Sequence, residues 1–243
     1  MANIIEMSDV SFTWPSAGSE VEQFGISIDR FALTPGSRTL LLGPSGSGKS
    51  TFLSLLCGIA APERGAIRVL GTDITQLKSG PRDRFRAEHI GIIFQMFNLL
   101  PYGSLVDNVL LPLSFAAARR RRAALDGTTE TEALRLLGEL GLSEAQCRGP
   151  AAALSVGQQQ RVAVARALIG SPEIIVADEP TSALDKTRQT RFLDLLFEQA
   201  TGAKATLIMV SHDESLTGRF DQVLQLNDIV HRMEQGAEEK VPA

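Results

Sequence analysis

A glycine-rich segment, "GPSGSGKS" at residues 43–50, carries the residue types that hold a chain of phosphates. It fits the spacing G-x-x-x-x-G-K-[ST] and lies between an apolar run and a helical run, which is the context that this motif needs. Glycines let the backbone wrap an anion closely, and the free N–H groups of the loop and helix start attract it. We expect Lys49 to reach the β- and γ-phosphates and the Ser50 hydroxyl to ligate Mg²⁺.

Two adjacent carboxylates, Asp178 and Glu179, follow the apolar run in "IIVADEP" (174–180). A buried strand ending there places them at the sheet edge where α/β proteins bind ligands. We expect Asp178 to hold Mg²⁺, directly or through water, and Glu179 to polarise the attacking water as a base. A capping or turn role is the alternative for this pair. His212, just past "TLIMVS" (206–211), lies at the same edge, and we expect it to contact the γ-phosphate.

A second helix start with anion-binding chemistry occurs in "ALSVGQQQRVAVARAL" (153–168). Ser155 and Gly157 stand where the loop becomes a helix, so free N–H groups and a hydroxyl are available there. Val156 lies between them, and its branched side chain disfavours a positive φ. The loop is therefore expected to adopt a conformation that valine accepts. Together with the segment 43–50, the chain thus has two helix starts that could bind phosphate.

The elements that position these residues can be read from the hydrophobic pattern. Nearly all-apolar runs separated by helical stretches predict a parallel sheet covered on both faces. These runs are 38–43, 89–94, 173–178 and 206–211. The opening forty residues and 64–71 instead alternate apolar and polar residues between Gly and Pro turns, which predicts a small antiparallel sheet.

The predicted fold class is α/β, as a single domain over residues 1–243. It consists of a P-loop NTPase core with a mostly parallel sheet, an N-terminal antiparallel β subdomain and an inserted α-helical subdomain. The expected ranges are about 1–40 and 64–75 for the antiparallel part, about 38–63, 76–96 and 166–230 for the core, and about 97–165 for the helical subdomain. The tail, "MEQGAEEKVPA" (233–243), is expected to be frayed.

Composition limits the classes of partner. The net charge of −4 argues against nucleic-acid binding, for which basic faces dominate. Cys57 and Cys147 match neither a disulfide framework nor a zinc site and are interpreted as free thiols. The start, "MANIIEMSDVSF", lacks a basic-then-apolar leader, and no apolar run approaches the ~20 residues that span a bilayer. Any membrane role is therefore expected to come through a partner.

A run of four arginines, Arg119–Arg122, is the local exception to the acidic balance. The first interpretation is a solvated helix face. The alternative is contact with anionic lipid headgroups or with an acidic loop of a partner.

The order of these motifs resembles the nucleotide-binding subunit of ATP-binding-cassette (ABC) transporters over nearly the whole chain. The motifs are, in chain order, "GPSGSGKS", Gln95 ending "IIFQ", "LSVGQ", "IIVADEP", "SALD" (182–185) and "SH" (211–212). The resemblance implies an ATPase that uses ATP and Mg²⁺. Val156 is a departure, because the family's usual signature has glycine there.

The resemblance implies roles for particular side chains. Trp14 falls where the family places an aromatic residue that stacks on adenine, with Phe12 as the fallback and a core aromatic as the alternative. The implied ATP-binding residues are Trp14, Gly43, Pro44, Ser45, Gly46, Ser47, Gly48, Lys49, Ser50, Thr51, Gln95, Ser155, Gly157 and Gln158. The implied Mg²⁺ ligands are Ser50, Gln95 and Asp178, and the implied catalytic residues are Glu179, His212 and Asp185.

Members of this family close head to tail as dimers, which gives both helix starts a purpose. Each ATP would lie between the 43–50 loop of one copy and Ser155 and Gly157 of the other. One chain that carries both half-sites can form a two-fold homodimer with two complete sites. Asp185 and its neighbours would cross the interface and couple the two sites.

The segment "IGIIFQMFNLLPYGSLVDNVLLPL" resembles the branch that powers macrolide export, lipoprotein release and cell-division signalling. The resemblance implies an integral membrane permease contacted near Gln95–Leu100, at the cytoplasmic face of a bacterial-type inner membrane. Met96, Phe97, Leu99 and Leu100 would form an apolar groove for a helix of that partner, with Gln95 sensing the γ-phosphate. The alternative is that these side chains only pack the helical subdomain.

Other classes of the same superfamily fit the chain less well. A DNA-repair or chromosome-organising ATPase would need a long coiled-coil insertion, and a ribosome-associated factor would carry two cassettes. A soluble ATPase acting on an assembly scaffold, such as that of iron–sulfur biogenesis, stays open as the alternative function. The specificity for cargo is expected to lie in the membrane subunit.

Overall fold

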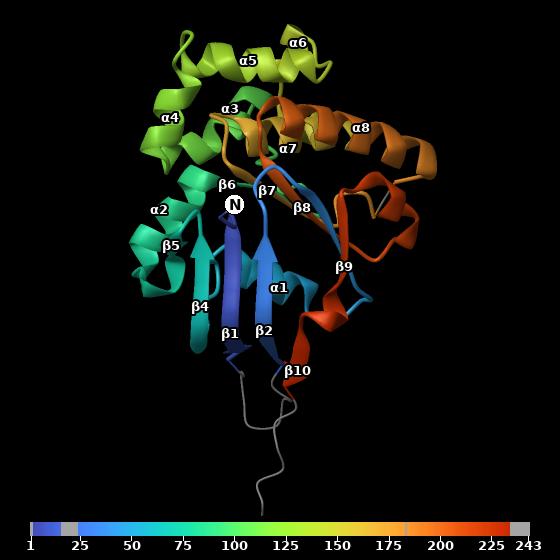
Figure 1. The fold of residues 1–243 in the computed structure, drawn as a ribbon. Coiled ribbons are helices and arrows are strands. Elements are labelled where there is room, and N and C mark those ends of the chain that lie inside the picture. The colour runs from blue at the N-terminus through green and yellow to red at the C-terminus, as the bar shows by residue number, and fades with distance from the viewer. Residues whose placement is uncertain (1, 16–23, 183, 234–243) are drawn as a thin grey trace, which may run out of the picture.

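Two sheets form the framework of the computed structural model, which describes residues 2–15, 24–182 and 184–233 (Figure 1). The parallel sheet has the strand order β6-β7-β8-β3-β9. Its strands are β3 (Arg38–Leu42), β6 (Ile90–Ile93), β7 (Ile174–Asp178), β8 (Thr206–Ser211) and β9 (Gln222–Gln225). The first four coincide with the apolar runs that predicted them. β9 was not predicted, because its four residues alternate too briefly to be distinguished from a loop.

The second sheet is antiparallel, as its alternating pattern predicted, with the order β10-β2-β1-β4-β5. Its strands are β1 (Ile5–Thr13), β2 (Gly25–Leu33), β4 (Arg64–Val69), β5 (Thr72–Asp73) and β10 (His231–Met233). β10 adds the far end of the described chain to β2, which the sequence did not predict. The rest of the tail predicted to be frayed, 234–243, lies outside the described residues.

Helix α1 (Lys49–Leu56) packs between the two sheets. Phe52 is fully buried on this helix and contacts Phe31 of β2 edge to face, with ring centroids 5.1 Å apart. Because side chains alternate along a strand, Leu41 of β3 faces α1 while Leu40 and Leu42 face the opposite layer. The parallel sheet is therefore covered on both faces, which explains its nearly all-apolar strands.

The opposite layer contains α7 (Val156–Leu168) and α8 (Lys186–Gly202), and the short helices between residues 105 and 147 lie at the same end of the molecule (Figure 1). α7 begins within the segment assigned to the helical insertion and ends against the parallel sheet. The remaining helices are α2 (Ser79–His89), α3 (Leu105–Leu110), α4 (Ala117–Ala123), α5 (Thr129–Glu139) and α6 (Glu144–Cys147). The 3₁₀ turns are η1 (Ile74–Gln76), η2 (Leu111–Ser114), η3 (Ala151–Ala153), η4 (Glu214–Arg219) and η5 (Leu226–Asp228).

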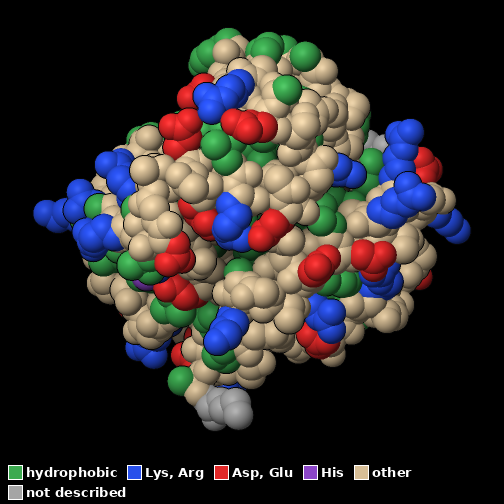
Figure 2. Space-filling model, turned by 90° about the horizontal axis from the view of Figure 1, so that it is seen from above, with side chains coloured by type: hydrophobic (Ala, Val, Ile, Leu, Met, Phe, Trp, Pro, Cys, Tyr) green, Lys and Arg blue, Asp and Glu red, His purple; other side chains and the backbone are tan. Residues whose placement is uncertain are grey.

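Neither the face drawn in Figure 2 nor the two cysteines indicates a specialised surface or a disulfide. On the face seen in Figure 2, basic side chains are interspersed with acidic ones. Cys57 and Cys147 are both buried and free, and burial raises the pKa of Cys57 to about 12. Within the described ranges, no helix has the length and apolar character that crossing a membrane requires.

The arginine run corrects the sequence interpretation. Arg119 is 1% exposed, so the expected solvated face is wrong for this residue. Its guanidinium donates to backbone carbonyls where two helices end, including Ala87 of α2 at 3.2 Å and Ala167 of α7 at 2.6 Å. The last carbonyls of a helix lack intrahelical partners and carry negative partial charge, so a planar cation can satisfy several at once.

The rest of the run is divided between backbone and solvent. The Arg120 guanidinium donates to the Leu113 carbonyl and that of Arg122 donates to the Gly170 carbonyl, while Arg121 is exposed. The run therefore fastens α4 to the core more than it presents charge to a membrane.

Replacing Arg119 should destabilise the fold, because the carbonyls that it satisfies would stay buried without a donor. We expect Arg119→Ala to lower the free energy of unfolding by about 3 kcal/mol or more, at about 1–3 kcal/mol for each unsatisfied buried group. Arg121→Ala is the matched control from the same run and should stay within about 0.5 kcal/mol. Urea unfolding followed by circular dichroism measures both. Equal midpoints for the two variants would contradict the fastening role.

Candidate functional site

The glycine-rich loop 43–48 joins β3 to α1 at the carboxyl end of the parallel sheet. The N–H of Gly43 donates to the Ser211 carbonyl at 3.1 Å, which ties the loop to β8. Gly46 and Gly48 have φ angles of 79° and 96°, a region that side-chain-bearing residues rarely adopt. The Lys49 ammonium folds back over the loop and donates to the Gly43 carbonyl at 2.8 Å. The predicted phosphate-binding loop is thus held in a curled form that glycines make accessible.

A cavity of about 370 Å³ opens over this loop. Its lining includes Ser45, Gly46 and Lys49, together with Ser50 and Thr51 at the start of α1. Positive side-chain charge and free N–H groups therefore face one hollow at a helix start, which suits a chain of phosphates. Pro44 and Ser47 complete the turn, since the Ser47 N–H donates to the Pro44 carbonyl at 3.2 Å.

Glu179 lines this cavity and contacts both Lys49 and His212. One Glu179 carboxylate oxygen lies 3.1 Å from the Lys49 ammonium, and the other lies 2.6 Å from Nδ1 of His212. Glu179 is 9% exposed, whereas the His212 side chain is 53% exposed. The structure therefore brings together three residues that lie far apart in the sequence.

The backbone at Glu179 is strained. Its φ is 43°, which is unusual for a residue other than glycine. The conformation is fixed by its N–H, which donates to the Val210 carbonyl of β8 at 3.0 Å. Strain of this kind costs about 1–3 kcal/mol and persists where the surrounding structure over-determines it. Here it turns the carboxylate toward the cavity of the glycine-rich loop.

Asp178 ends β7 beside Glu179 and is half-buried. Burial raises the pKa of Asp178, the neighbouring Glu179 raises it further, and Lys49 lowers it. Both raising causes disfavour the charged carboxylate, so a bound cation would offset them. This position suits the predicted metal-binding role.

The predicted aromatic residue, Trp14, lies next to α1. Its indole Nε1 donates to the Thr51 hydroxyl at 2.9 Å, and the side chain is partly exposed. Trp14 contacts Phe12 edge to face, with centroids 4.9 Å apart. Phe12, the fallback, is buried at 7% exposure, so it offers no open face for stacking.

Gln95 and Asp185 each make side-chain hydrogen bonds within the described chain. Ala183, which lies between Ser182 and Asp185 in the sequence, is outside the described residues. The Gln95 carboxamide donates to the Ser182 hydroxyl at 3.3 Å. Asp185 is the N-cap of α8 and accepts from the Arg188 N–H at 2.9 Å. In one chain, Asp185 thus has a capping role in addition to the predicted role between copies.

The apolar residues after Gln95 are arranged differently from the predicted groove. Met96 is 79% exposed, but Phe97 is buried at 7% exposure. The Arg166 guanidinium donates to the carbonyls of Phe97 and Asn98, which holds this turn against α7. The expectation that Phe97 lines an exposed groove is therefore wrong, because the backbone anchor turns its ring into the core. Leu99 is half-buried against the same core.

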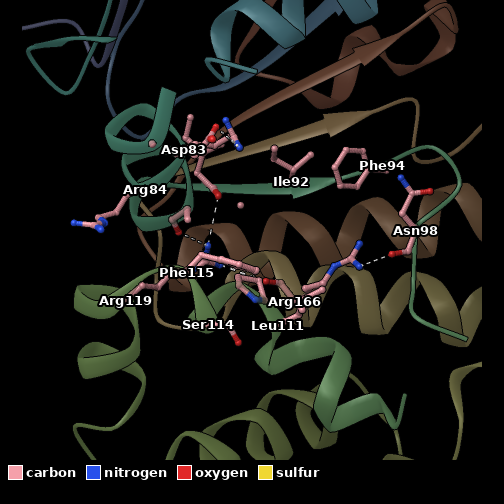
Figure 3. A pocket seen from close by; sticks show the side chains of 16 residues that line it. Asp83, Arg84, Ile92, Phe94, Asn98, Leu111, Ser114, Phe115, Arg119 and Arg166 are labelled. Atoms are coloured by element: carbon pink, nitrogen blue, oxygen red, sulfur yellow. Dashed lines mark hydrogen bonds and ion pairs between the residues drawn. The ribbon is translucent and has the colours of Figure 1, made fainter. Parts of the chain in front are cut away.

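A groove of about 810 Å³ lies beside that turn, between α2, β6 and η2 (Figure 3). Phe94, Leu111 and Phe115 line it, with Arg119 and Arg166 on its inner side. Phe115 is 66% exposed. Phe115 was not among the residues predicted from the sequence. The available signal was the apolar segment "LPLSF" at 111–115, which is short and interrupted by Pro112, so it shows no helical stripe.

Ser155 caps α7 through a reciprocal pair with Gln158. The Ser155 hydroxyl accepts from the Gln158 N–H at 3.4 Å, and the Gln158 carboxamide accepts from the Ser155 N–H at 2.9 Å. Val156 is the first helical residue and is not among those with positive φ, as its side chain requires. Gly157 faces open space. This helix start lines a separate cavity of about 710 Å³, away from the glycine-rich loop.

Comparisons with known proteins agree on one family. The family described as "ABC transporter" matches residues 27–182. The lipoprotein-releasing system ATP-binding protein LolD of Novosphingobium aromaticivorans is 37% identical over 211 residues, which cover 85% of this chain and 91% of LolD. The macrolide export ATP-binding/permease protein MacB of Syntrophobacter fumaroxidans is 36% identical over 241 residues, covering 99% of this chain and 33% of MacB.

Solved structures agree with the sequence matches. A dimeric ATP-binding cassette in a post-hydrolysis state, bound to ADP and Pi, superposes with a TM-score of 0.76. It is 30% identical in sequence, and the match covers 96% of this chain and 99% of that one.

Proposed function

This chain belongs to the ABC transporter family as an ATP-binding subunit with ATPase activity, and we propose that Glu179 is the base of its reaction. The observation that carries this proposal is the contact of Glu179 with Lys49 at 3.1 Å and with His212 at 2.6 Å. A buried carboxylate beside the phosphate loop can accept a proton from the attacking water. His212, half-exposed beside Glu179, would donate to the γ-phosphate and hold Glu179 in place.

ATP would bind along the glycine-rich loop, with its phosphates on the N–H groups of residues 43–51. Lys49 would exchange its contact with Glu179 for the β- and γ-phosphates, which frees the carboxylate to face water. Adenine would stack on Trp14, whose partly exposed ring lies next to Thr51. Phe12 is too buried to serve in its place.

Mg²⁺ would be held by Ser50 and Asp178, with Gln95 as a further ligand. When bound, the ion neutralises charge on the β- and γ-phosphates. The raised pKa of Asp178 supports this assignment, because a cation favours the ionised form that burial and Glu179 disfavour. Gln95 would sense the γ-phosphate from the end of β6, where it now contacts Ser182.

We further propose that two copies close head to tail around two ATP molecules. The glycine-rich loop and the Ser155 helix start line separate cavities in one chain, which supports completing each site from a second copy. Ser155, Gly157 and Gln158 would donate to the γ-phosphate held by the facing copy. Asp185, which already caps α8, would cross the interface. A cassette of known structure that this chain resembles is dimeric.

The membrane partner is proposed to be a permease that seats a helix in the groove beside Gln95. The groove is apolar along Phe94, Leu111 and Phe115, as a helix-in-groove contact requires. Of the segment Gln95–Leu100 named from the sequence, Asn98 lines the groove, so the proposed contact overlaps that segment. The relative MacB combines ATP-binding and permease parts in one protein, which supports this class of partner over an assembly scaffold. The chain would then act at the cytoplasmic face of the inner membrane.

Glu179→Gln tests the base. The amide keeps the size of the side chain but cannot accept a proton, so we expect kcat to fall by about 10²-fold or more. ATP binding should persist, and the variant should accumulate as an ATP-bound dimer. Phosphate release measures turnover, and light scattering measures the dimer. A variant that hydrolyses ATP near the wild-type rate would show that Glu179 is not the base.

The pair Ser155→Ala with Gly157→Asp tests the half-site in the second copy. The change removes a hydroxyl donor and places a negative charge where the γ-phosphate of the facing copy would lie. We expect nucleotide affinity of the monomer to be kept and ATP-dependent dimerisation to be lost, as measured by light scattering. Gly202→Asp, in open space at the end of α8, is the control for an added charge. Unchanged dimerisation of the double variant would contradict closure through this helix start.

Phe115→Asp tests the groove. The change removes an exposed aromatic side chain from the apolar wall of the groove and puts a hydrated charge in its place, so we expect loss of co-purification with the integral membrane protein in mild detergent. Leu125→Asp is the control, because Leu125 is 79% exposed but does not line the groove. ATP-dependent dimerisation should be normal in both variants. Equal recovery of the membrane protein with both would place the contact elsewhere, and co-purification of the wild type with a soluble scaffold would favour the alternative function.

A further inference from the structure

A basic side chain from the far end of the chain reaches the nucleotide cavity. β10 pairs with β2, with Arg232 opposite Ile26. This pairing places Arg232 at the edge of the antiparallel sheet that faces the glycine-rich loop. Arg232 and Phe24 line the same cavity of about 370 Å³ as Lys49 and Thr51. The sequence motifs include neither Arg232 nor Phe24.

Phe24 orients the guanidinium. Cζ of Arg232 lies 5.0 Å from the centroid of the Phe24 ring, so the cation rests over the aromatic face. Stacking occupies the flat face of a guanidinium and leaves the N–H donors at its edge available to an oxyanion. An arginine held in this way loses less conformational freedom on binding than a free surface arginine does.

The Phe24 ring, on which Arg232 stacks, lies against the glycine-rich loop. A Cβ built on Gly48 would lie 3.6 Å from the tip of the Phe24 ring and 3.5 Å from a methyl group of Val230. These are ordinary van der Waals distances, so the ring packs directly against the loop at Gly48. Phe24 therefore connects Arg232 to the glycine that precedes Lys49.

The position along the cavity selects which phosphate Arg232 would reach. Lys49 and Glu179 mark the end where the γ-phosphate is proposed to lie. Trp14 marks the nucleoside end, since its indole Nε1 donates to the Thr51 hydroxyl. The backbone N–H of Trp14 donates to the Phe24 carbonyl at 3.0 Å. Phe24 and the guanidinium stacked on it are thus neighbours of the residue proposed to bind adenine.

We propose that Arg232, positioned by Phe24, binds the α-phosphate of the nucleotide, an inference that rests on the proposed ATP site. The contact is present with ATP and ADP alike, because both carry an α-phosphate. Arg232 therefore strengthens binding of substrate and product uniformly and does not act on the γ-phosphate in the chemical step. Its consequence is retention of ADP after phosphate leaves.

Nucleotide titration of Arg232→Ala tests this assignment. Trp14 is the single tryptophan of the chain, so its fluorescence reports binding of ADP, or of ATP without Mg²⁺. We expect Kd to rise about ten-fold for both nucleotides, as for loss of a charge-assisted hydrogen bond. Calorimetry with ADP checks the same Kd without a signal from Trp14.

Three variants distinguish the effects of charge, of the planar guanidinium and of the aromatic ring on nucleotide binding. Arg30→Ala removes the same charge from an exposed position on β2 and should change Kd less than about two-fold. Arg232→Lys keeps the charge without the planar group and should fall between wild type and Arg232→Ala. Phe24→Leu keeps apolar bulk but removes the aromatic face, and it should weaken binding in the same direction as Arg232→Ala.

Salt dependence distinguishes a phosphate contact from packing. The loss caused by Arg232→Ala should shrink as ionic strength rises from about 0.05 M to about 0.5 M, because an exposed ion pair is screened. A loss independent of salt, a loss confined to ATP, or an Arg232→Ala Kd equal to that of Arg30→Ala would each overturn the assignment. Failure of the ATP site itself would be seen separately, as unchanged nucleotide binding by Lys49→Ala.

Discussion

The Lys49 ammonium and the Glu179 carboxylate face each other at 3.1 Å with side chains only 9% and 11% exposed, and the site is organised around this pair. Removing two charges from water is costly, and a buried pair is weak evidence for stability. Its presence is better explained by chemistry. Both groups are held where a triphosphate would bring more negative charge, so the contact between them can be exchanged for contacts with phosphate and water.

The topology brings these charges together. Residues 43–49 follow β3, Glu179 follows β7, and His212 follows β8, and these three strands are neighbours in the parallel sheet. Parallel strands end at the same edge of the sheet, so residues that follow them lie close together even though they are distant in sequence. The Gly43 N–H to Ser211 carbonyl bond and the Glu179 N–H to Val210 carbonyl bond both attach the site to β8. The central strand therefore sets the relative position of loop, base and histidine.

Site residues that directly follow an apolar strand could be predicted from the sequence. Residues whose environment is set by backbone groups far away in the sequence could not. The loop, Glu179 and His212 could be placed because each comes directly after an all-apolar run. Arg119 could not, because its burial depends on carbonyls of α2 and α7 that lie 32 and 48 residues away in sequence. Phe97 was misplaced for the same kind of reason, since Arg166 anchors its carbonyl from α7. The sequence around Arg119 and around Phe97 contains no pattern that indicates these distant contacts.

Helix α7 connects the two surfaces on which the proposed function depends. Ser155 caps its first turn, where the phosphate of a facing copy is proposed to bind, and Arg166 in its last turn donates to the Asn98 carbonyl beside the groove. Arg119 in turn donates to the Ala167 carbonyl and lines that groove. A helix of 13 residues is about 20 Å long, so α7 reaches from one of these surfaces to the other. A shift of its first turn on closure would therefore move the groove as well. Phosphate binding at the start of α7 would in this way be coupled to the groove in which a membrane helix is proposed to bind.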